Sequence, residues 1–263
     1  MPTISASGID LYYEVEGEGF PLLLVAGYTC SISKWNLMRE RLAENYQLIL
    51  IDNRGVGRSG CPQAPYSIGD MANDGVFLLD HLRVKRAHVV GHSMGVAIAQ
   101  KIAAYHPERV EKLVLCNTSS QFNTVCLKAL SSLLALSRAK VDPMLVFNAT
   151  APWIFSSHFL SNEGNMAAVM QAMSSDLFPQ TLLGQEGQFN ALLTFSSKED
   201  LAKISAPTLI ITGEQDLIIS VSEAKDLAAH IAHARVHIMT DMGHDPLIED
   251  PRGLCSLVRE FLT

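Results

Sequence analysis

One short stretch has both the residues and the setting of a serine nucleophile. Residues 91–95 (GHSMG) follow a short buried strand, residues 87–90, and precede an apolar, helix-forming run, residues 96–104. A G-x-S-x-G sequence at a strand-to-helix junction is typical of a sharp turn, in which the two glycines let neighbouring backbones come close. The Ser93 oxygen would then lie above a sheet at the positive end of a helix dipole. This context predicts that Ser93 is a nucleophile.

A serine nucleophile needs a general base, and the base needs an acid to orient it. Asp216 lies in a loop after the predicted strand 208–212, and His244 lies in a loop after the predicted strand 234–239. Both loops leave the carboxyl ends of strands, so the two side chains can meet Ser93 at one edge of a sheet. The chain order serine, acid, histidine is also the order in nucleophile-elbow enzymes. The sequence therefore predicts a Ser-His-Asp triad.

Other chemistry-bearing groups have simpler explanations. Glu214 and Asp241, the rivals of Asp216, are interpreted as solvated loop charges, and His92 should point away from its neighbour Ser93 and pack. Residues 55–60 fit G-x-G-x-x-G, but a proline-rich turn follows them where a dinucleotide-binding fingerprint opens a helix. Three histidines straddle a helix end and a strand start without a neighbouring cysteine, so no metal site is expected there: His230, His233 and His237.

The elements that position these residues alternate at both ends of the chain. A half-exposed strand is expected at 9–15, and core strands at 22–26, 47–51, 87–90, 110–116, 208–212 and 234–239. Helices are expected at 34–45, 68–82, 94–105, 220–231 and 253–262. This alternation predicts an α/β protein with a mostly parallel sheet covered by helices on both faces.

The middle of the chain breaks this alternation. Residues 118–204 show helical apolar spacing and no convincing strand, so we predict a core formed by residues 1–117 and 205–263 with an inserted helical cap, or lid, over the strand ends. Between residues 141 and 197 there is no Lys or Arg, whereas aromatic residues are frequent. Four of them are predicted to contact substrate in an apolar pocket: Trp153, Phe155, Phe159 and Phe178.

Together these motifs resemble the α/β-hydrolase superfamily, in the branch of esterases, enol-lactonases and cofactor-free haloperoxidases. Residues 52–59 match the family's D-x-R-G-x-G-x-S loop, residues 206–216 match the strand that carries the triad acid, and residues 243–251 match the segment that carries the triad histidine. The resemblance implies the α/β-hydrolase fold and a triad of Ser93, Asp216 and His244. It also implies that no metal or organic cofactor is required.

The segment that forms the oxyanion hole departs from the family pattern. Members usually show His-Gly-x after the third strand, and the backbone N–H of x helps to hold the developing oxyanion. Here Ala26 stands where the histidine is usual, before Gly27 and Tyr28. Because the donor is a main-chain N–H, the resemblance implies that Tyr28 and Met94 still supply the hole. The alternative is that Gly27 merely makes a turn, and what braces the loop in place of the histidine is left open.

We therefore expect a serine hydrolase that cleaves carboxylic esters of small, neutral, apolar substrates through an acyl-enzyme. A cap without Lys or Arg offers an anionic substrate no fixed cation and weakens the enol-lactone alternative. An acyltransferase, a perhydrolase or a lyase could use the same triad, and a ligand receptor with very slow turnover could retain it. A substrate screen beside a binding assay would distinguish these classes.

The composition bears on partners and location. A formal net charge of −7 argues against a nucleic-acid partner, and no run of 18 apolar residues is available to span a membrane. The N-terminus has no signal-peptide pattern, and the five cysteines are scattered without C-x-x-C, as is typical of reduced thiols in the cytoplasm. We expect a cytoplasmic enzyme whose partner is a small-molecule ester, and leave open whether it forms a homodimer.

Overall fold

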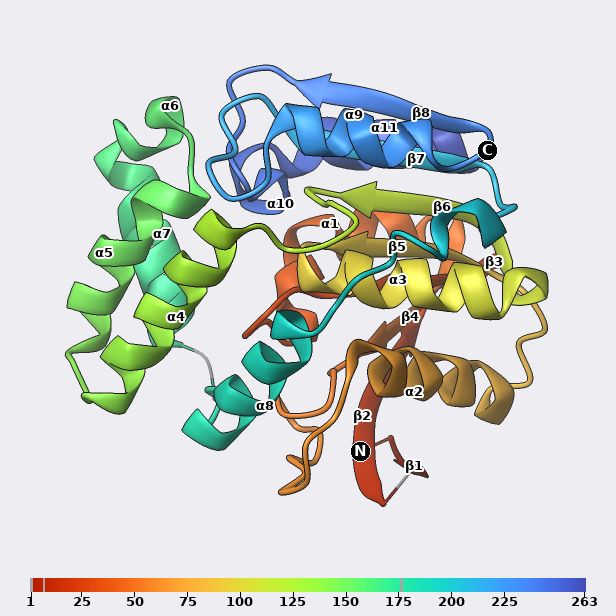
Figure 1. The fold of residues 1–263 in the computed structure, drawn as a ribbon, viewed down its shortest axis with the longest axis horizontal. Coiled ribbons are helices and arrows are strands. Elements are labelled where there is room, and N and C mark those ends of the chain that lie inside the picture. Colours follow the sequence, from red (N-terminus) through yellow and green to blue (C-terminus); the bar gives the residue numbers. More distant parts are fainter. Residues whose placement is uncertain (1, 7, 176) are drawn as a thin grey trace.

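An eight-stranded, mostly parallel sheet forms the centre of the molecule (Figure 1). The structure, a computed structural model, describes residues 2–6, 8–175 and 177–263. The strands lie in the order β1-β2-β4-β3-β5-β6-β7-β8, in which β1 and β2 run antiparallel to their neighbours. They comprise Thr3–Ala6 (β1), Ile9–Glu16 (β2), Phe20–Val25 (β3), Tyr46–Ile51 (β4), Ala87–His92 (β5), Val110–Cys116 (β6), Thr208–Gly213 (β7) and Ala234–Met239 (β8). The predicted α/β class is confirmed, and among the strands of the described residues the short edge strand β1 is the one that was not predicted.

Helices cover both faces of the sheet because the strands are apolar on both sides. Along β3, Leu23 and Val25 pack into one hydrophobic core with α2 (Ile68–His81), α3 (Met94–Tyr105) and α9 (Val221–Ala229). Leu22 and Leu24 pack into the other core with α1 (Asn36–Ala43) and α11 (Pro251–Leu262). This period-two division is that of a strand buried on both faces. Four short helical segments are also described: η1 (Ile32–Trp35), η2 (Pro107–Arg109), η3 (Leu201–Lys203) and α10 (Pro246–Glu249).

Between β6 and β7 the described residues form helices and no strand, as the spacing predicted. These helices are α4 (Thr124–Arg138), α5 (Pro143–Ile154), α6 (Ser157–Leu160), α7 (Glu163–Ser174) and α8 (Leu182–Leu193). In Figure 1 they lie beyond the carboxyl ends of the parallel strands, at the left of the view. We call residues 118–204 the helical insertion. α4 and α8 contribute to the first core of the sheet, whereas α5 and α6 form a small core of their own, against which α7 packs.

The chain leaves the sheet for the helical insertion and returns to it at neighbouring points. The Ser197 N–H donates to the Ser120 carbonyl oxygen at 2.9 Å. The Ser197 hydroxyl also donates to the Gln100 side chain on α3, which in turn donates from Nε2 to the Ser119 carbonyl oxygen at 3.1 Å. Gln100 and Ser197 are buried. A buried polar network on α3 therefore joins the two ends of the insertion.

None of the helices in the described part of the chain combines the length and apolar character needed to cross a membrane. All five cysteines are free. Helix boundaries agree with the predicted ranges to within a few residues. The largest difference is at the predicted helix 34–45, which starts as the 3₁₀ turn η1 and ends at Ala43.

Candidate active site

Ser93 lies at the junction of β5 and α3, in the sharp turn that the sequence predicted. Its φ of 53° and ψ of −119° are far from the regions that non-glycine residues prefer. A Cβ on Gly91 would come within 2.5 Å of the Gly95 carbonyl oxygen, and a Cβ on Gly95 within 2.1 Å of the Val25 carbonyl oxygen. Glycine is therefore required at both positions, because a side chain on Gly91 would collide with the start of α3 and a side chain on Gly95 would collide with the end of β3.

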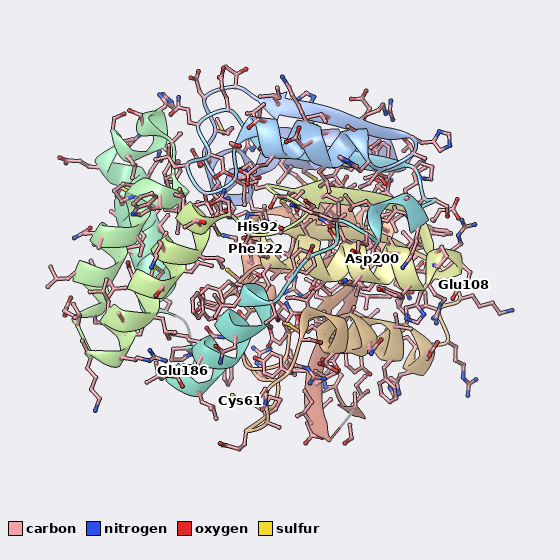
Figure 2. All side chains as sticks on the ribbon, in the orientation of Figure 1. Cys61, His92, Glu108, Phe122, Glu186 and Asp200 are labelled. Carbon is pink, nitrogen blue, oxygen red and sulfur yellow. The ribbon has the colours of Figure 1, made fainter. Side chains whose placement is uncertain are left out.

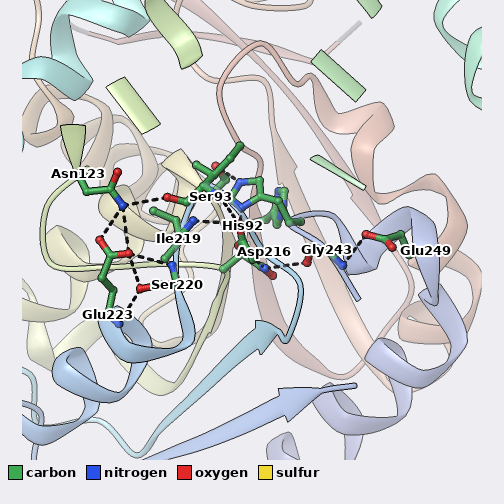
Figure 3. A network of polar contacts seen from close by, with 12 residues as sticks. His92, Ser93, Asn123, Asp216, Ile219, Ser220, Glu223, Gly243 and Glu249 are labelled. Carbon is green, nitrogen blue, oxygen red and sulfur yellow. Dashed lines mark hydrogen bonds and ion pairs between the residues drawn. The ribbon is translucent and has the colours of Figure 1, made fainter. Parts of the chain in front are cut away.

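The structure brings Ser93, His244 and Asp216 together in one hydrogen-bonded row. Figure 3 labels Ser93 and Asp216 in the network of polar contacts around it. His244 Nε2 lies 2.9 Å from Ser93 Oγ, and His244 Nδ1 lies 2.7 Å from Asp216 Oδ2. The three residues follow β5, β7 and β8, so each stands at the carboxyl end of a strand. This is the geometry in which a base can take the proton of a serine while an acid fixes its tautomer.

Asp216 is held as a carboxylate by its hydrogen-bond donors and by His244. Its Oδ1 accepts the N–H groups of Ile218 and Ile219 at 2.8 and 2.9 Å, and its Oδ2 accepts Asn117 Nδ2 at 2.8 Å. Burial by itself raises the pKa of Asp216, but the neighbouring His244 and these hydrogen bonds outweigh it and set the pKa below the ordinary value. The sequence analysis missed Asn117, which directly follows β6. The one signal for its role was that it is a polar residue directly after an apolar strand.

His244 has the properties of a base whose charged form is stabilised. Burial lowers its pKa, but the carboxylate of Asp216 raises it more, so the pKa of His244 lies above the ordinary value. Its backbone is held on both sides, since its N–H donates to the Ile154 carbonyl oxygen at 2.7 Å and its carbonyl oxygen lies 3.0 Å from His92 Nε2. Burial lowers the pKa of His92 to about 4, so His92 is neutral near pH 7 and packs, as expected, behind the base.

Further groups support the histidine loop. Glu249 accepts the N–H groups of Gly243 at 2.9 Å and of Ser156 at 3.0 Å, and so ties this loop to the helical insertion. Lys34 forms a buried ion pair with Asp245, the residue after His244. Sequence reasoning missed these contacts, because they join segments far apart in the chain.

The rival acids lie elsewhere. Asp241 is exposed and accepts Gln215 Nε2 at 3.3 Å. Glu214 is also exposed and accepts the Asp241 N–H at 3.3 Å. These contacts stay within the two surface loops, which fits the interpretation of both carboxylates as solvated loop charges.

The loop expected to form the oxyanion hole lies directly beside Ser93. A Cβ on Gly27 would approach Ser93 Cβ to 3.2 Å, so the backbone of this loop packs against the nucleophile. The main-chain N–H groups of Tyr28 and Met94 have no acceptor in the described part of the chain, as the predicted oxyanion hole requires.

The structure also explains what braces this loop where Ala26 replaces the usual histidine. Asn53 Nδ2 donates to the Ala26 carbonyl oxygen at 3.1 Å. From α8 of the insertion, Gln188 Oε1 accepts the Thr29 N–H at 3.1 Å, and the Gln185 carbonyl oxygen accepts the Tyr28 hydroxyl at 3.2 Å. Both the loop after β4 and the helical insertion therefore hold this loop.

The four aromatic residues predicted to contact substrate occupy two kinds of environment. Phe155 and Phe159 are buried in the small core of the insertion, where their rings stack with centroids 4.8 Å apart. Trp153 is 41% exposed and Phe178 is 38% exposed. Their contact with substrate stays a prediction. Phe122 belongs to the apolar core that also contains Met94, and Figure 2 labels it with His92 where the sheet meets the insertion.

Two of the cations that could attract an anionic substrate are paired. Arg54 Nε and Nη2 donate to the two oxygens of Asp74 at 2.7 and 2.6 Å, and both side chains are buried. Arg138 forms an ion pair with Glu186 at 2.8 Å. The geometry of the Arg54 pair is bidentate, which is the strongest arrangement for a guanidinium and a carboxylate.

The model of the α/β hydrolase fold family matches residues 21–251 of the chain. The chain belongs to the α/β-hydrolase family. Together with its relatives, this membership identifies the chain as a hydrolase of the esterase and enol-lactonase branch.

Three of its relatives illustrate the range of named activities in this family. RutD of Azorhizobium caulinodans, which carries the name of a carbamate hydrolase, is 32% identical over 90% of this chain and 88% of its own. The 3-oxoadipate enol-lactonase 2 of Acinetobacter baylyi is 27% identical over 95% of this chain and 92% of its own. A thermophilic esterase of Thermogutta terrifontis is similar in structure with a TM-score of 0.85 and 26% identity, covering 99% of this chain and 96% of that one.

Proposed function

We propose that this α/β hydrolase cleaves carboxylic esters of small, neutral, apolar compounds through an acyl-enzyme on Ser93. The observation that carries the proposal is the row of contacts from Ser93 Oγ through His244 to Asp216, with spacings of 2.9 and 2.7 Å. These spacings lie within the range that proton transfer between nucleophile and base requires. The relatives carry the names of a carbamate hydrolase, an enol-lactonase and an esterase, and carbamates, lactones and esters all contain an acyl carbonyl next to a leaving group.

The chemistry follows from these contacts. Ser93 Oγ attacks the carbonyl carbon while its proton passes to His244 Nε2, and the carbonyl oxygen becomes an oxyanion that the Tyr28 and Met94 N–H groups hold. When the tetrahedral intermediate collapses, the bond to the leaving alcohol breaks and His244 returns the proton to the alcohol oxygen. Water, deprotonated by His244, then attacks the acyl-enzyme and releases the acid and Ser93.

The preference for neutral substrates is supported by the charges around the site. No Lys or Arg lies between residues 141 and 197, and the buried Arg54 is neutralised by Asp74. An anionic group would therefore lose its hydration without gaining a partner in this part of the chain. We further propose that the helical insertion, residues 118–204, acts as a cap over Ser93, since it lies beyond the carboxyl ends of the strands (Figure 1).

The test combines covalent labelling with a substrate screen. A serine-directed fluorophosphonate should add one label per chain, at Ser93, and Ser93→Ala should fold normally yet lose about four to six orders of magnitude in kcat. Neutral esters of graded acyl length should be hydrolysed faster than matched carbamates and lactones. Labelling at another serine, or full activity in Ser93→Ala, would contradict the proposed mechanism.

Two further measurements separate the other classes. Partition of the acyl group to an added alcohol or to peroxide, at the expense of hydrolysis, would indicate an acyltransferase or a perhydrolase. Tight ligand binding with negligible turnover would indicate a receptor. Product formation without a trappable acyl-enzyme would indicate a lyase.

A further inference from the structure

Gln188 lies on α8 in the helical insertion, but its side chain joins two loops of the core. It is fully buried. Its Nε2 donates to the Arg54 carbonyl oxygen at 3.0 Å, in the loop after β4, and its Oε1 accepts the Thr29 N–H at 3.1 Å, in the loop after β3. Oε1 also accepts Gln180 Nε2 at 3.0 Å. A buried amide with both ends satisfied fixes the spacing between these loops.

The loop that Gln188 holds is the one that carries the Tyr28 N–H. Thr29, whose amide Gln188 accepts, has a φ of 63°, which β-branched residues rarely adopt, so this turn depends on outside contacts. The Tyr28 hydroxyl donates to the Gln185 carbonyl oxygen on the same helix at 3.2 Å. α8 therefore contacts the predicted oxyanion donor through the Tyr28 side chain and contacts the next residue, Thr29, through its backbone N–H.

Two glycines let α8 come close enough to the core for these hydrogen bonds to form. Gly184 and Gly187 precede Gln188 by four and one residues, and both contact the core. A Cβ on Gly184 would lie 1.9 Å from the Gly55 carbonyl oxygen, and a Cβ on Gly187 would lie 2.7 Å from the Tyr66 ring. Larger residues here would push the helix outward and draw the amide of Gln188 away from Thr29.

We infer that Gln188 is a positioning residue that holds the Tyr28 N–H toward the oxyanion, so that the oxyanion hole is complete only while α8 is docked on the core. The inference rests on the proposed function, because it assigns a role in the same reaction. Since Ala26 replaces the histidine that is usual in the family, Gln188 and Asn53 together supply the brace for this loop. The helical insertion then controls turnover as well as access.

The test replaces the amide by apolar side chains of similar size, in Gln188→Leu and Gln188→Met. Removing an oxyanion donor lowers kcat by about 10²–10³-fold in other hydrolases, and we expect about a 10- to 100-fold loss here, because the N–H is displaced but still present. KM should change less than about threefold, since the ground-state carbonyl depends little on this donor. Asn190→Ala, at an exposed position of the same helix, is the matched control and should keep the original kcat.

Three outcomes decide the inference. A kcat loss in both Gln188 variants, with Ser93 still fully labelled by the phosphonate, supports it. An unchanged kcat in either folded variant overturns it. A Gln188 that only stabilised the fold would lower the melting temperature when replaced and would leave kcat unchanged. If both variants fail to fold, the crystal structure of the phosphonate adduct of the unaltered chain decides: the phosphoryl oxygen must accept the Tyr28 N–H while Gln188 stays bonded to Thr29. Failure of the unaltered chain to react at Ser93 would contradict the proposed function instead.

Discussion

Replacing Asp216 by asparagine leaves the size of the side chain unchanged and removes one charge, and the contacts around it determine how the amide must lie. Oδ1 accepts two main-chain N–H groups, those of Ile218 and Ile219, so the amide oxygen stays at that position. The new NH₂ group then faces His244 Nδ1 and Asn117 Nδ2. Two donors cannot bond to each other, so His244 must leave Nδ1 unprotonated and carry its proton on Nε2.

A proton on Nε2 blocks the reaction, because that nitrogen can no longer accept the proton of Ser93. We expect Asp216→Asn to lower kcat by about 10⁴-fold, the loss seen when a triad aspartate is replaced in this way, which corresponds to about 5.4 kcal/mol in activation free energy. The pKa of His244 should also fall, because the carboxylate that raises it is gone while the burial that lowers it remains. The residual activity should therefore reach its plateau at a lower pH than in the unaltered enzyme.

The assay is kcat/KM for one neutral ester across pH, measured for Asp216→Asn and for Asp241→Asn. Asp241 is exposed, and its carboxylate contacts Gln215, so its substitution should change kcat/KM by less than about twofold. Equal melting temperatures of the two variants would show that both are folded. Normal activity in Asp216→Asn together with a large loss in Asp241→Asn would refute the assignment of the acid.

Three further predictions concern pH and charge. In the unaltered enzyme kcat/KM should rise with pH as His244 loses its proton, with a midpoint above 6.5, the ordinary pKa of a histidine. A midpoint below 6.5 would show that burial lowers the pKa of His244 more than the carboxylate of Asp216 raises it. A neutral ester should be hydrolysed faster than its carboxylate-bearing analogue, and the reverse order would mean that a cation such as Arg54, Lys128 or Arg138 reaches the site. Burial lowers the pKa of His88 to about 4, so between pH 6.5 and 4 the unfolded chain binds a proton that the folded chain does not. His88→Leu should therefore remove up to about 1.4 kcal/mol per pH unit from the slope of the unfolding free energy in urea titrations over that range.

Much of the fold was predictable because its signals are local. The apolar runs of β3 to β8 and the helical spacing of α2 and α3 are properties of a few neighbouring residues. The turn at Ser93 was predictable for the same reason, since both glycines that it requires lie within two residues of the serine. The edge strand β1 was not predicted, because four residues of mixed polarity carry no clear period.

The groups that support the site were not predictable from the sequence. Asn53, Asn117 and Gln188 act on backbone atoms or side chains that lie far from them along the chain, and each belongs to a residue type that is common on surfaces. For the aromatic residues of the insertion, the sequence signal was clear but had two possible explanations. Phe155 and Phe159 were predicted to contact substrate because they are large and apolar, which is equally what a small core of helices requires.

The contact between Ser120 and Ser197 has a consequence for how such a chain can diversify. The two ends of the insertion are joined, because Ser197 is hydrogen-bonded to Ser120 and to Gln100 on α3. The segment between these two serines is therefore a closed loop attached to the core at one place. Doubling the length of a flexible closed loop costs only about 0.6 kcal/mol, so the strands constrain the length of this segment only weakly. They constrain its composition more, because a replacement must supply the apolar faces with which α4 and α8 pack into the first core. Under the proposed cap role, exchange at these two serines would give the scaffold a new range of substrates, provided that the replacement segment brings its own brace for the loop at Tyr28.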